Sequence, residues 1–374
     1  MVEEDERPMR DLKVFGAPNL YVQGPGAVAQ LGALMKGMGT RVLLISDSHV
    51  VALLLPLLKA PLEAEGYAFS SRGFVGEVTP ARIEKMASDV RTFAPDIVLA
   101  AGGGKGMDMG KAVSRALGAR LVSLPTAASN DGPTSRIFVL YDEDHRLLGP
   151  ERLARNPELV VVDTALIARA PVPLLVSGIG DALVKRFEAS QCVGADGPNM
   201  FGARATLAAP ALAELCDRVL RDNAVAALAA ARAKTPDAAF EKVIEACFLL
   251  AGLGFEGSGL SIAHAMTRGL SAVPQTASAF HGCQVAYALL VQFLLELRTK
   301  EFMDEQFGFY RKVGLPICLK DFGLMEPTAD DLHTIAELTH KAPHTANFER
   351  ALAPDDLVAA MERLEALSAR APAR

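Results

Sequence analysis

The sequence lacks several features that mark particular classes of protein. Its 374 residues include no Trp, and aromatic residues make up only 6%, so no aromatic platform for stacking bases or sugars is expected. The interior has to be built mainly from Ala, Leu, Val and Gly. Basic residues do not dominate either: 38 Lys and Arg stand against 44 Asp and Glu, for a formal net charge of −6. Proteins that bind nucleic acid usually present a basic face, so nucleic acid is not predicted as a partner.

Patterns typical of disulfides, targeting and membranes are also missing. The five cysteines are odd in number and form no Cys-x-x-Cys pair, so neither a disulfide framework nor a Cys-ligated zinc site is expected. The first ten residues, MVEEDERPMR, have neither the basic start nor the apolar run of a signal peptide. Apolar runs such as 51–58 are far shorter than the roughly 20 residues that span a bilayer. We therefore expect a reduced, soluble, cytoplasmic protein without a membrane partner.

The first part of the chain alternates between strand-like and helical patterns. Half of all residues are hydrophobic, and the length predicts about two domains. A run at 137–142, followed by Glu143 and Asp144, indicates an antiparallel hairpin. Other short runs are continuously apolar and separated by helical patterns, which favours a parallel sheet covered on both faces. These predicted strands are 41–46, 96–101, 119–124 and 159–163.

After about residue 170 the strand-like runs almost vanish. Pro171 and Pro173 punctuate the chain, and several of the segments that follow have the apolar spacing of helices, with Asp237 and Ser258 as plausible N-caps. We predict an α/β domain over residues 1–171 and an all-helical domain over residues 172–374. The predicted helices are 181–192, 203–222, 238–251, 258–270, 282–298, 303–313, 329–339 and 354–369.

A glycine-rich loop, LAAGGGKGMD at 99–108, follows a predicted strand and opens a helix at Asp108. Backbone N–H groups at such a turn and the positive end of the helix form an anion site, and glycine lets a pyrophosphate approach the backbone. The loop does not fit G-x-G-x-x-G, because Met107 replaces the third glycine. It does not fit the Walker pattern either, because Lys105 and Ala112 stand at required positions. A tight turn without a ligand is the alternative interpretation.

Asp47 stands at the end of the predicted strand 41–46. A carboxylate in this place accepts hydrogen bonds from an adenosine ribose and repels a 2′-phosphate, which favours NAD over NADP. Taken alone, Asp47 fits the N-cap of the following helix equally well.

Two of the seven histidines point to a metal centre. His264 and His281 lie in neighbouring helical segments among small or apolar residues, where packing does not require an imidazole. Asp181 lies at the start of a strongly apolar helix. One carboxylate and two imidazoles suit Zn²⁺ or Fe²⁺ and leave coordination positions open. Spacing alone does not bring the three together, since a buried histidine is often a core residue and Asp181 can cap its helix. Among the other histidines, His344 is a weaker candidate.

Taken in chain order, these motifs resemble those of the glycerol dehydrogenases, within the iron-containing (metal-dependent group III) alcohol dehydrogenases. The resemblance extends over nearly the whole chain. It implies an α/β Rossmann-like NAD-binding domain over 1–171 and an all-α metal- and substrate-binding domain over 172–374, the architecture of dehydroquinate synthase. The segments that carry it are GGGKGMDMGK (102–111), PTAASND (125–131), GIGDAL with FEA (178–189), GFEGSGLSIAH (254–264) and FHG (280–282).

The resemblance also implies roles for individual residues. Asp181, His264 and His281 would be the catalytic metal ligands, for Zn²⁺ or alternatively Fe²⁺. Asp131 would bind the polyol, and Asp47 the ribose of NAD. The other implied cofactor contacts are Gly103, Gly104, Lys105, Gly106 and Met107 at the pyrophosphate, Thr126 and Ser129, and, near the nicotinamide end, Ser135, Ile137 and Tyr141.

The implied reaction is the oxidation of glycerol, or a related vicinal diol, to dihydroxyacetone by hydride transfer from a metal-bound alkoxide to NAD. The resemblance further implies a homo-oligomer, often an octamer.

The chain also departs from the family pattern. Thr267-Arg268-Gly269 stands where glycerol dehydrogenases tend to have His-Asn-Gly, and Gly282-Cys283-Gln284 where they tend to have Gly-Glu-Lys. The segment 125–135 also resembles that of glycerol-1-phosphate dehydrogenases. Arg268 would suit a phosphate or carboxylate, or would face solvent. Two alternatives therefore stay open: a reductase of dihydroxyacetone phosphate or another small anionic ketone, and a non-enzymatic nucleotide-binding protein on this fold.

Overall fold

A computed structural model describes residues 9–143 and 147–370. Contacts divide the chain into two compact units. The sheet unit consists of Ala17–Gly178 and Ala226–Gly252, and the helical unit of Met1–Gly16, Ile179–Val225 and Leu253–Arg374. The chain thus leaves the sheet unit at Gly178, close to the expected boundary at 171, and residues 226–252 belong with the sheet. Residues 1–8 and Asp144, on which the targeting and hairpin expectations partly rested, lie outside the described residues.

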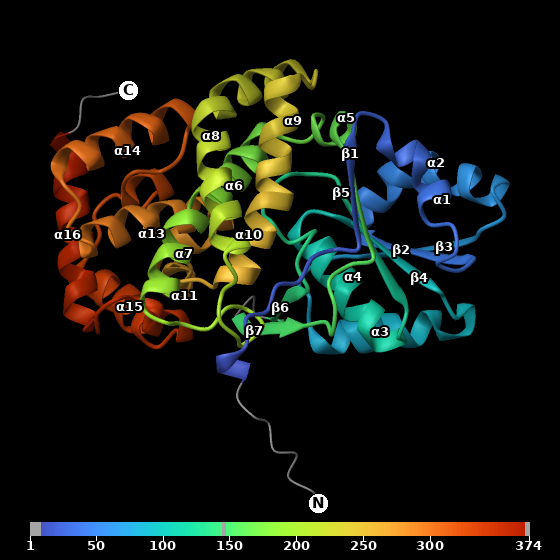
Figure 1. Cartoon of the computed structure of the whole chain (residues 1–374), viewed down its shortest axis with the longest axis horizontal. Coiled ribbons are helices and arrows are strands. Elements are labelled where there is room, and N and C mark those ends of the chain that lie inside the picture. The colour runs from blue at the N-terminus through green and yellow to red at the C-terminus, as the bar shows by residue number, and fades with distance from the viewer. Residues whose placement is uncertain (1–8, 144–146, 371–374) are drawn as a thin grey trace, which may run out of the picture. The chain divides into compact units, whose positions relative to one another are not determined.

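A six-stranded parallel sheet forms the centre of the sheet unit (Figure 1). The strand order is β1-β8-β5-β4-β2-β3, and the four predicted strands are the four inner ones. The two strands that the apolar pattern did not indicate are the edge strands, whose side chains are mostly half-buried or exposed. The bounds are β1 Leu20–Gly24, β2 Arg41–Asp47, β3 Ala68–Phe74, β4 Ile97–Gly102, β5 Arg120–Pro125 and β8 Leu159–Asp163.

Helices cover both faces of this sheet. On β2, Val42 and Leu44 face one core, which includes leucines of α2 (Ser48–Ala64). Leu43 and Ile45 face the other core, formed with α3 (Pro80–Val90) and α4 (Gly104–Leu117). Because successive side chains of a strand point to opposite faces, a strand covered on both sides has to be apolar at every position. This explains why the inner strands are recognisable as continuous apolar runs.

The predicted hairpin is confirmed: β6 (Ile137–Tyr141) pairs antiparallel with β7 (Leu147–Arg152). The sheet unit also contains α9 (Ala238–Glu245), which begins at the predicted N-cap Asp237, whose side chain accepts a hydrogen bond from Phe240 N–H at 2.8 Å. A π-helical turn, η4 (Ala246–Leu250), follows α9 directly.

The described part of the helical unit contains helices and no β-strand beyond an isolated bridge between Lys13 and Arg204, so the expected α/β part and helical part are both present. Its central helix is α13, from Gln284 onwards buried along its whole length, and α11 packs against both α13 and α15. Within the described residues, no helix is long and apolar enough to cross a membrane. The helices are α7 Lys185–Gly194, α10 Ala251–Ser258, α11 Ile262–Leu270, α12 Pro274–Ala277, α13 His281–Leu295, α14 Lys300–Val313, α15 Ala329–His340 and α16 Pro354–Arg370, with parts of α6 Val172–Leu183 and α8 Ala208–Ala233.

Several helix boundaries differ from those expected. Ser258 ends α10 and is not an N-cap, because α11 begins after Ser261. Two further differences involve the candidate sites. Helix α6 already begins at Val172, because Pro173 lies in its first turn, where a missing N–H costs little. Asp181 therefore lies near the end of a helix and does not cap its start. Helix α4 begins at Gly104 and not at Asp108, because Gly104 and Gly106 adopt helical backbone although glycine is typical of turns.

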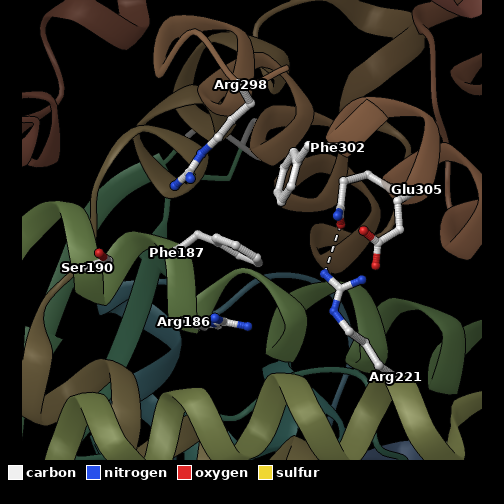
Figure 2. A pocket seen from close by; sticks show the side chains of 8 residues that line it. Arg186, Phe187, Ser190, Arg221, Arg298, Phe302 and Glu305 are labelled. Carbon is white, nitrogen blue, oxygen red and sulfur yellow. Dashed lines mark hydrogen bonds between the residues drawn. The ribbon is translucent and has the colours of Figure 1, made fainter. Parts of the chain in front are cut away.

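A cavity of about 300 Å³ lies within the helical unit (Figure 2). Its arginines are already engaged: Arg186 and Arg221 each pair with the buried Asp217, and Arg298 pairs with Glu296. None of the predicted site residues lines it, and these ion pairs account for its three arginines. Its lining residues are Arg186, Phe187, Ser190, Arg221, Arg298, Phe302, Glu305 and Gln306.

Candidate functional site

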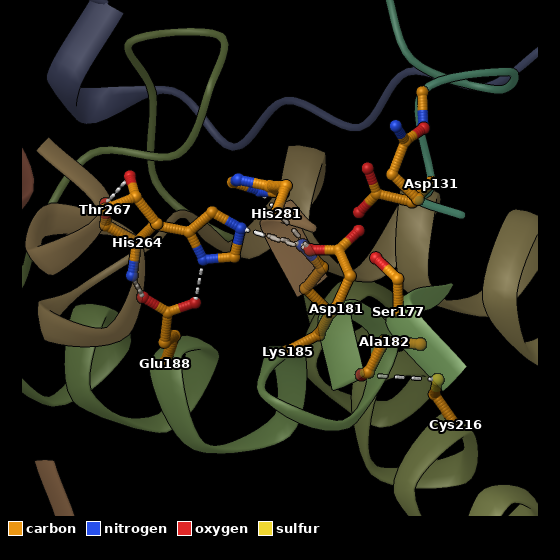
Figure 3. Close-up of polar contacts among 12 residues, drawn as sticks. Asp131, Ser177, Asp181, Ala182, Lys185, Glu188, Cys216, His264, Thr267 and His281 are labelled. Atoms are coloured by element: carbon orange, nitrogen blue, oxygen red, sulfur yellow. Dashed lines mark hydrogen bonds and ion pairs between the residues drawn. The ribbon is translucent and has the colours of Figure 1, made fainter. Parts of the chain in front are cut away.

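The three predicted metal ligands come together in the helical unit (Figure 3). Asp181 comes from the last turn of α6, His264 from α11, and His281 is the first residue of α13. One ligand atom from each lies within 4.8 Å of the others. Asp181 Oδ1 is 3.4 Å from His264 Nε2 and 3.8 Å from His281 Nε2. Helices distant in sequence thus present one carboxylate oxygen and two imidazole nitrogens to a common point.

Glu188 of α7 orients His264. Its Oε2 lies 2.5 Å from His264 Nδ1, while its Oε1 accepts the backbone N–H groups of Ser261 at 2.9 Å and His264 at 2.8 Å. A carboxylate on Nδ1 holds the ring proton there and leaves the Nε2 lone pair directed at Asp181. Metal-binding histidines typically have this partner on the other ring nitrogen. The donor set and its support therefore fit a Zn²⁺ or Fe²⁺ ion.

The ionisation of the cluster follows from its charges. Burial alone would raise the pKa of Asp181, but the Lys185 ammonium and the two imidazoles outweigh it and hold that pKa well below its usual range. Burial opposes protonation of His264, yet the Glu188 carboxylate raises its pKa. Partial loss of solvent lowers the pKa of His281 to about 4, the Asp181 carboxylate opposes this shift, and the Lys185 ammonium adds to it. An ionised carboxylate and a neutral imidazole are the forms that bind a metal. The shifts favour these forms for Asp181 and His281, whereas the raised pKa of His264 means that a metal competes there with a proton.

Lys185, the first residue of α7, adds a cation to the cluster. Its side chain is 1% exposed, and its Nζ lies 2.9 Å from Asp181 Oδ1 and 3.1 Å from His264 Nε2. The ammonium also lies 4.9 Å from the centre of the Phe255 ring. Sequence reasoning missed both Lys185 and Glu188. The signal was present, since Asp181, Lys185 and Glu188 follow one another at the i, i+4, i+7 spacing that places side chains on one helical face.

In the sheet unit, the glycine-rich segment joins β4 to α4. Gly102 ends the strand with φ +111°, and Gly103 caps the helix. A Cβ on Gly106 would lie 2.0 Å from the Ala101 carbonyl oxygen, and one on Gly110 would lie 2.2 Å from Ala100 Cβ. These glycines are required because the helix lies directly against the strand. Gly104, Lys105, Gly106 and Met107 therefore belong to the first turn of α4, where helical N–H groups can bind an anion.

Other predicted cofactor residues surround this turn. Thr126 N–H donates to the Gly102 carbonyl at 3.1 Å, and a Cβ on Gly103 would lie 3.6 Å from Ser129 Oγ. A Cβ on Gly102 would lie 3.8 Å from Asp47 Oδ2. Asp47 also caps α2, because its Oδ1 accepts the N–H groups of His49 and Val50, both at 3.0 Å. Asp47, Thr126 and Ser129 are thus gathered at the carboxyl end of β4.

In the structure Lys105 forms an ion pair with Glu77, whereas the expected partner is a pyrophosphate. Its ammonium lies 2.5 Å from Glu77 Oε1, and 53% of its side chain is exposed. A contact between Lys105 and a pyrophosphate stays a prediction.

Lys111 is a fully buried residue of α4. It anchors the segment that contains the predicted residues Asp131, Ser135 and Ile137. Its Nζ donates to the carbonyl oxygens of Gly132 at 2.6 Å and Ile137 at 2.7 Å, and it lies 3.3 Å from Ser135 Oγ. Asp131, directly before Gly132, is 8% exposed. One buried ammonium thereby orders the path from the predicted substrate residue to β6.

Asp108 and Tyr141 have perturbed pKa values in the same unit. Burial raises the pKa of Asp108 to about 6, against the opposing effect of Lys111. Burial also raises the pKa of Tyr141 to about 12, and Asp108 and Glu77 add to this. The phenol of Tyr141 therefore keeps its proton at neutral pH and is available as a hydrogen-bond donor.

Three residues noted in the sequence lie outside the metal cluster. Arg268 is exposed and contacts the Lys341 carbonyl oxygen at 3.5 Å. Burial raises the pKa of Cys283 to about 11, so it stays a thiol. Burial lowers the pKa of His344 to about 4, and His264 contributes to this shift.

Comparison with known proteins agrees with this geometry. The family model described as iron-containing alcohol dehydrogenase matches residues 18–164. The chain is 36% identical to glycolaldehyde reductase of Halobacterium salinarum, over 95% of this chain and 96% of that protein. It is 33% identical to glycerol dehydrogenase of Escherichia coli, over 93% and 95%. A crystal structure of a probable glycerol dehydrogenase from Sinorhizobium meliloti matches with a TM-score of 0.90 at 35% identity, over 96% and 99%. The chain therefore belongs to the iron-containing alcohol dehydrogenase family and is an oxidoreductase that acts on alcohol groups.

Proposed function

We propose that the enzyme interconverts a vicinal diol and the corresponding α-hydroxy carbonyl compound with NAD, glycerol and dihydroxyacetone being the first pair to test. The observation that carries this proposal is the cluster of Asp181, His264 and His281, with Glu188 on the second nitrogen of His264. The names of two relatives support the substrate class. Glycerol is a vicinal diol, and glycolaldehyde is the oxidation product of another, ethylene glycol.

Zn²⁺ is the proposed metal, with Fe²⁺ as the alternative, because both accept mixed carboxylate and imidazole ligands. When bound, the ion supplies a Lewis acid that lowers the pKa of a hydroxyl, and NAD⁺ supplies the hydride acceptor. Asp181, His264 and His281 would hold the ion. Glu188 keeps the ring proton of His264 on Nδ1, so that Nε2 can act as a ligand.

The sheet unit would hold NAD. The first turn of α4, from Gly103 to Gly106, offers N–H groups to the pyrophosphate. Asp47, with Oδ1 fixed by its cap bonds, presents Oδ2 near Gly102, where it would accept a ribose hydroxyl and repel a 2′-phosphate. Thr126 and Ser129 would line the same turn. Lys111 fixes the segment with Ser135 and Ile137, which would lie near the nicotinamide end together with Tyr141.

Asp131 would orient a substrate hydroxyl by a charge-assisted hydrogen bond. Its negative charge favours a neutral polyol over a phosphorylated one. Arg268 does not offset that preference, because it is exposed and contacts the Lys341 carbonyl. We therefore place uncharged diols ahead of glycerol 1-phosphate as substrates.

We also propose that the enzyme works in the cytoplasm as a homo-oligomer, with an octamer as one expected size. Light scattering of the purified protein measures the oligomer directly, and a monomeric mass would contradict this part of the proposal.

A substrate and cofactor panel tests the proposed reaction. Initial rates with NAD⁺ should be high for glycerol and ethylene glycol, low for 1-propanol, and lowest for glycerol 1-phosphate. NADP⁺ should support a much lower rate than NAD⁺. A preference for glycerol 1-phosphate would overturn the substrate class, and a preference for NADP⁺ would overturn the role of Asp47.

A further inference from the structure

Lys185 places a positive charge among the atoms that would hold a metal. Its Nζ is within hydrogen-bond distance of two of them, Asp181 Oδ1 at 2.9 Å and His264 Nε2 at 3.1 Å. An ammonium group has hydrogens to donate and no lone pair to offer. Lys185 therefore adds no ligand to the cluster, and its two contacts place a positive charge on atoms that would bind a metal.

At His264, the Lys185 ammonium and a metal ion cannot be bound at the same time. Glu188 holds the ring proton on Nδ1, so Nε2 has a single lone pair in the plane of the ring. That lone pair either accepts a hydrogen bond from the Lys185 ammonium or binds a metal ion. Asp181 Oδ1 has more than one lone pair, so the competition there is between two positive charges beside the same oxygen.

The position of Lys185 also explains how the cluster tolerates a buried carboxylate. Asp181 is 1% exposed, and a buried charge without a partner is strongly destabilising. The ammonium supplies the compensating charge. It is retained in the interior by the Phe255 ring, 4.9 Å away, through a cation–π contact.

We propose that Lys185 is the resident counter-cation of the metal-free site and that metal binding is a cation exchange. A divalent ion gains His264 Nε2 only when the Lys185 ammonium releases it, and at Asp181 Oδ1 the ion and the ammonium repel each other. The protein accordingly holds its metal less tightly than the same three ligands would without the lysine, and it stays folded when the metal is removed. This inference rests on the metal site of the proposed function.

Four variants separate the charge of Lys185 from its shape. Lys185→Met removes the charge and keeps a flexible stem, Lys185→Gln keeps N–H donors without the charge, and Lys185→Arg keeps the charge. Arg186→Met is the matched control, because it removes a positive charge from the next residue of α7, whose side chain lines the cavity of Figure 2 and pairs with Asp217. Zn²⁺ affinity is measured by competition with a chromogenic chelator, and Tm is measured with chelator and with Zn²⁺.

Loss of the charge should tighten Zn²⁺ binding by at least about tenfold in Lys185→Met and Lys185→Gln, because it removes the repulsion between the ammonium and a divalent ion bound beside it. Lys185→Arg and Arg186→Met should bind Zn²⁺ like the wild type. With chelator, Lys185→Met should melt several degrees below the wild type, and Zn²⁺ should raise its Tm more than that of the wild type. Lys185→Gln, which can still donate to Asp181, carries the same test if Lys185→Met does not fold.

The outcomes distinguish this inference from the proposed function. Equal or weaker Zn²⁺ binding by the uncharged variants overturns the exchange and leaves the metal site in place. Binding by Lys185→Met with none by the wild type supports the competition and contradicts a metal-dependent wild-type enzyme. If neither the wild type nor any variant binds Zn²⁺, both the exchange and the metal site are overturned.

Discussion

Glu188→Gln tests how the fold makes His264 a ligand. Glu188 accepts three hydrogen bonds: Oε1 accepts the backbone N–H groups of Ser261 and His264, and Oε2 accepts Nδ1–H of the His264 ring. Glutamine has the same size but only one oxygen. If that oxygen keeps the two backbone bonds, the NH₂ group faces Nδ1, and the ring proton has to move to Nε2. A protonated Nε2 cannot bind a metal.

The expected loss of Zn²⁺ affinity follows from the hydrogen bonds that the substitution changes. The opposite orientation of the glutamine would turn its NH₂ group toward two backbone N–H groups, and each buried N–H left unsatisfied costs about 1–3 kcal/mol. The first orientation is therefore favoured. Loss of a partner that supports a metal ligand weakens binding by about 10–100-fold, which corresponds to about 1.4–2.8 kcal/mol. The protonated Nε2 would also face the Lys185 ammonium at 3.1 Å, so the metal-free variant should melt below the wild type.

The assay is Zn²⁺ affinity by chelator competition, with ¹⁵N NMR of the His264 ring to locate its proton. Glu214→Gln is the control, because Glu214 is 64% exposed and lies 4.0 Å from Arg186, away from the cluster. It should bind Zn²⁺ like the wild type. Unchanged affinity in Glu188→Gln, or a proton that stays on Nδ1, would refute the reasoning.

Three further predictions concern the sheet unit. Asp108→Asn should remove a pH dependence of the wild-type stability, because burial raises the Asp108 pKa from 3.8 to about 6. Between those values the folded wild type holds more protons than the unfolded chain, so it loses stability as pH rises through them. Urea unfolding should show no difference below about pH 4 and up to about 3 kcal/mol in favour of the variant above about pH 6, and a pH-independent difference would contradict this. Gly106→Ala should weaken NADH binding and cost about 1–3 kcal/mol of stability, because its Cβ would lie 2.0 Å from the Ala101 oxygen; calorimetry of NADH binding measures this, and Gly308→Ala, with open space around the Cβ, is the neutral control. Asp131→Asn should lower kcat/KM for glycerol by about tenfold or more, as expected for loss of a charge-assisted hydrogen bond, while NADH affinity stays the same; unchanged glycerol kinetics would show that Asp131 does not contact the diol.

The strands predicted most accurately from the sequence are those buried on both faces of the sheet. The inner strands β2, β4, β5 and β8 are continuous apolar runs, so their pattern is visible without the structure. Strands β1 and β3 are only partly covered, and β3 reads AFSSRGF, which carries no such run. A continuous apolar run indicates a strand that is buried on both faces. Edge strands are partly exposed, so their sequences contain no such run.

The site was predictable to a different degree. Asp181, His264 and His281 were found because polar ligand types stand among apolar residues, and the structure brings them together. Lys185 and Glu188, which support them, were not predicted, because charged side chains of a helix usually face solvent and only the fold shows these two buried beside the ligands. Which residues share a helix face with a ligand depends on where the helix begins, and Pro173 was taken for a break when it lies in the first turn of α6.

The most direct test of the central claim is the initial rate of NADH formation from glycerol and NAD⁺ by protein stripped with a chelator, before and after titration with Zn²⁺ or Fe²⁺. A metal centre built from Asp181, His264 and His281 predicts a negligible rate without metal and a rate that rises to a plateau at one ion per chain. A full rate in the stripped protein, or no recovery with either ion, would contradict the account.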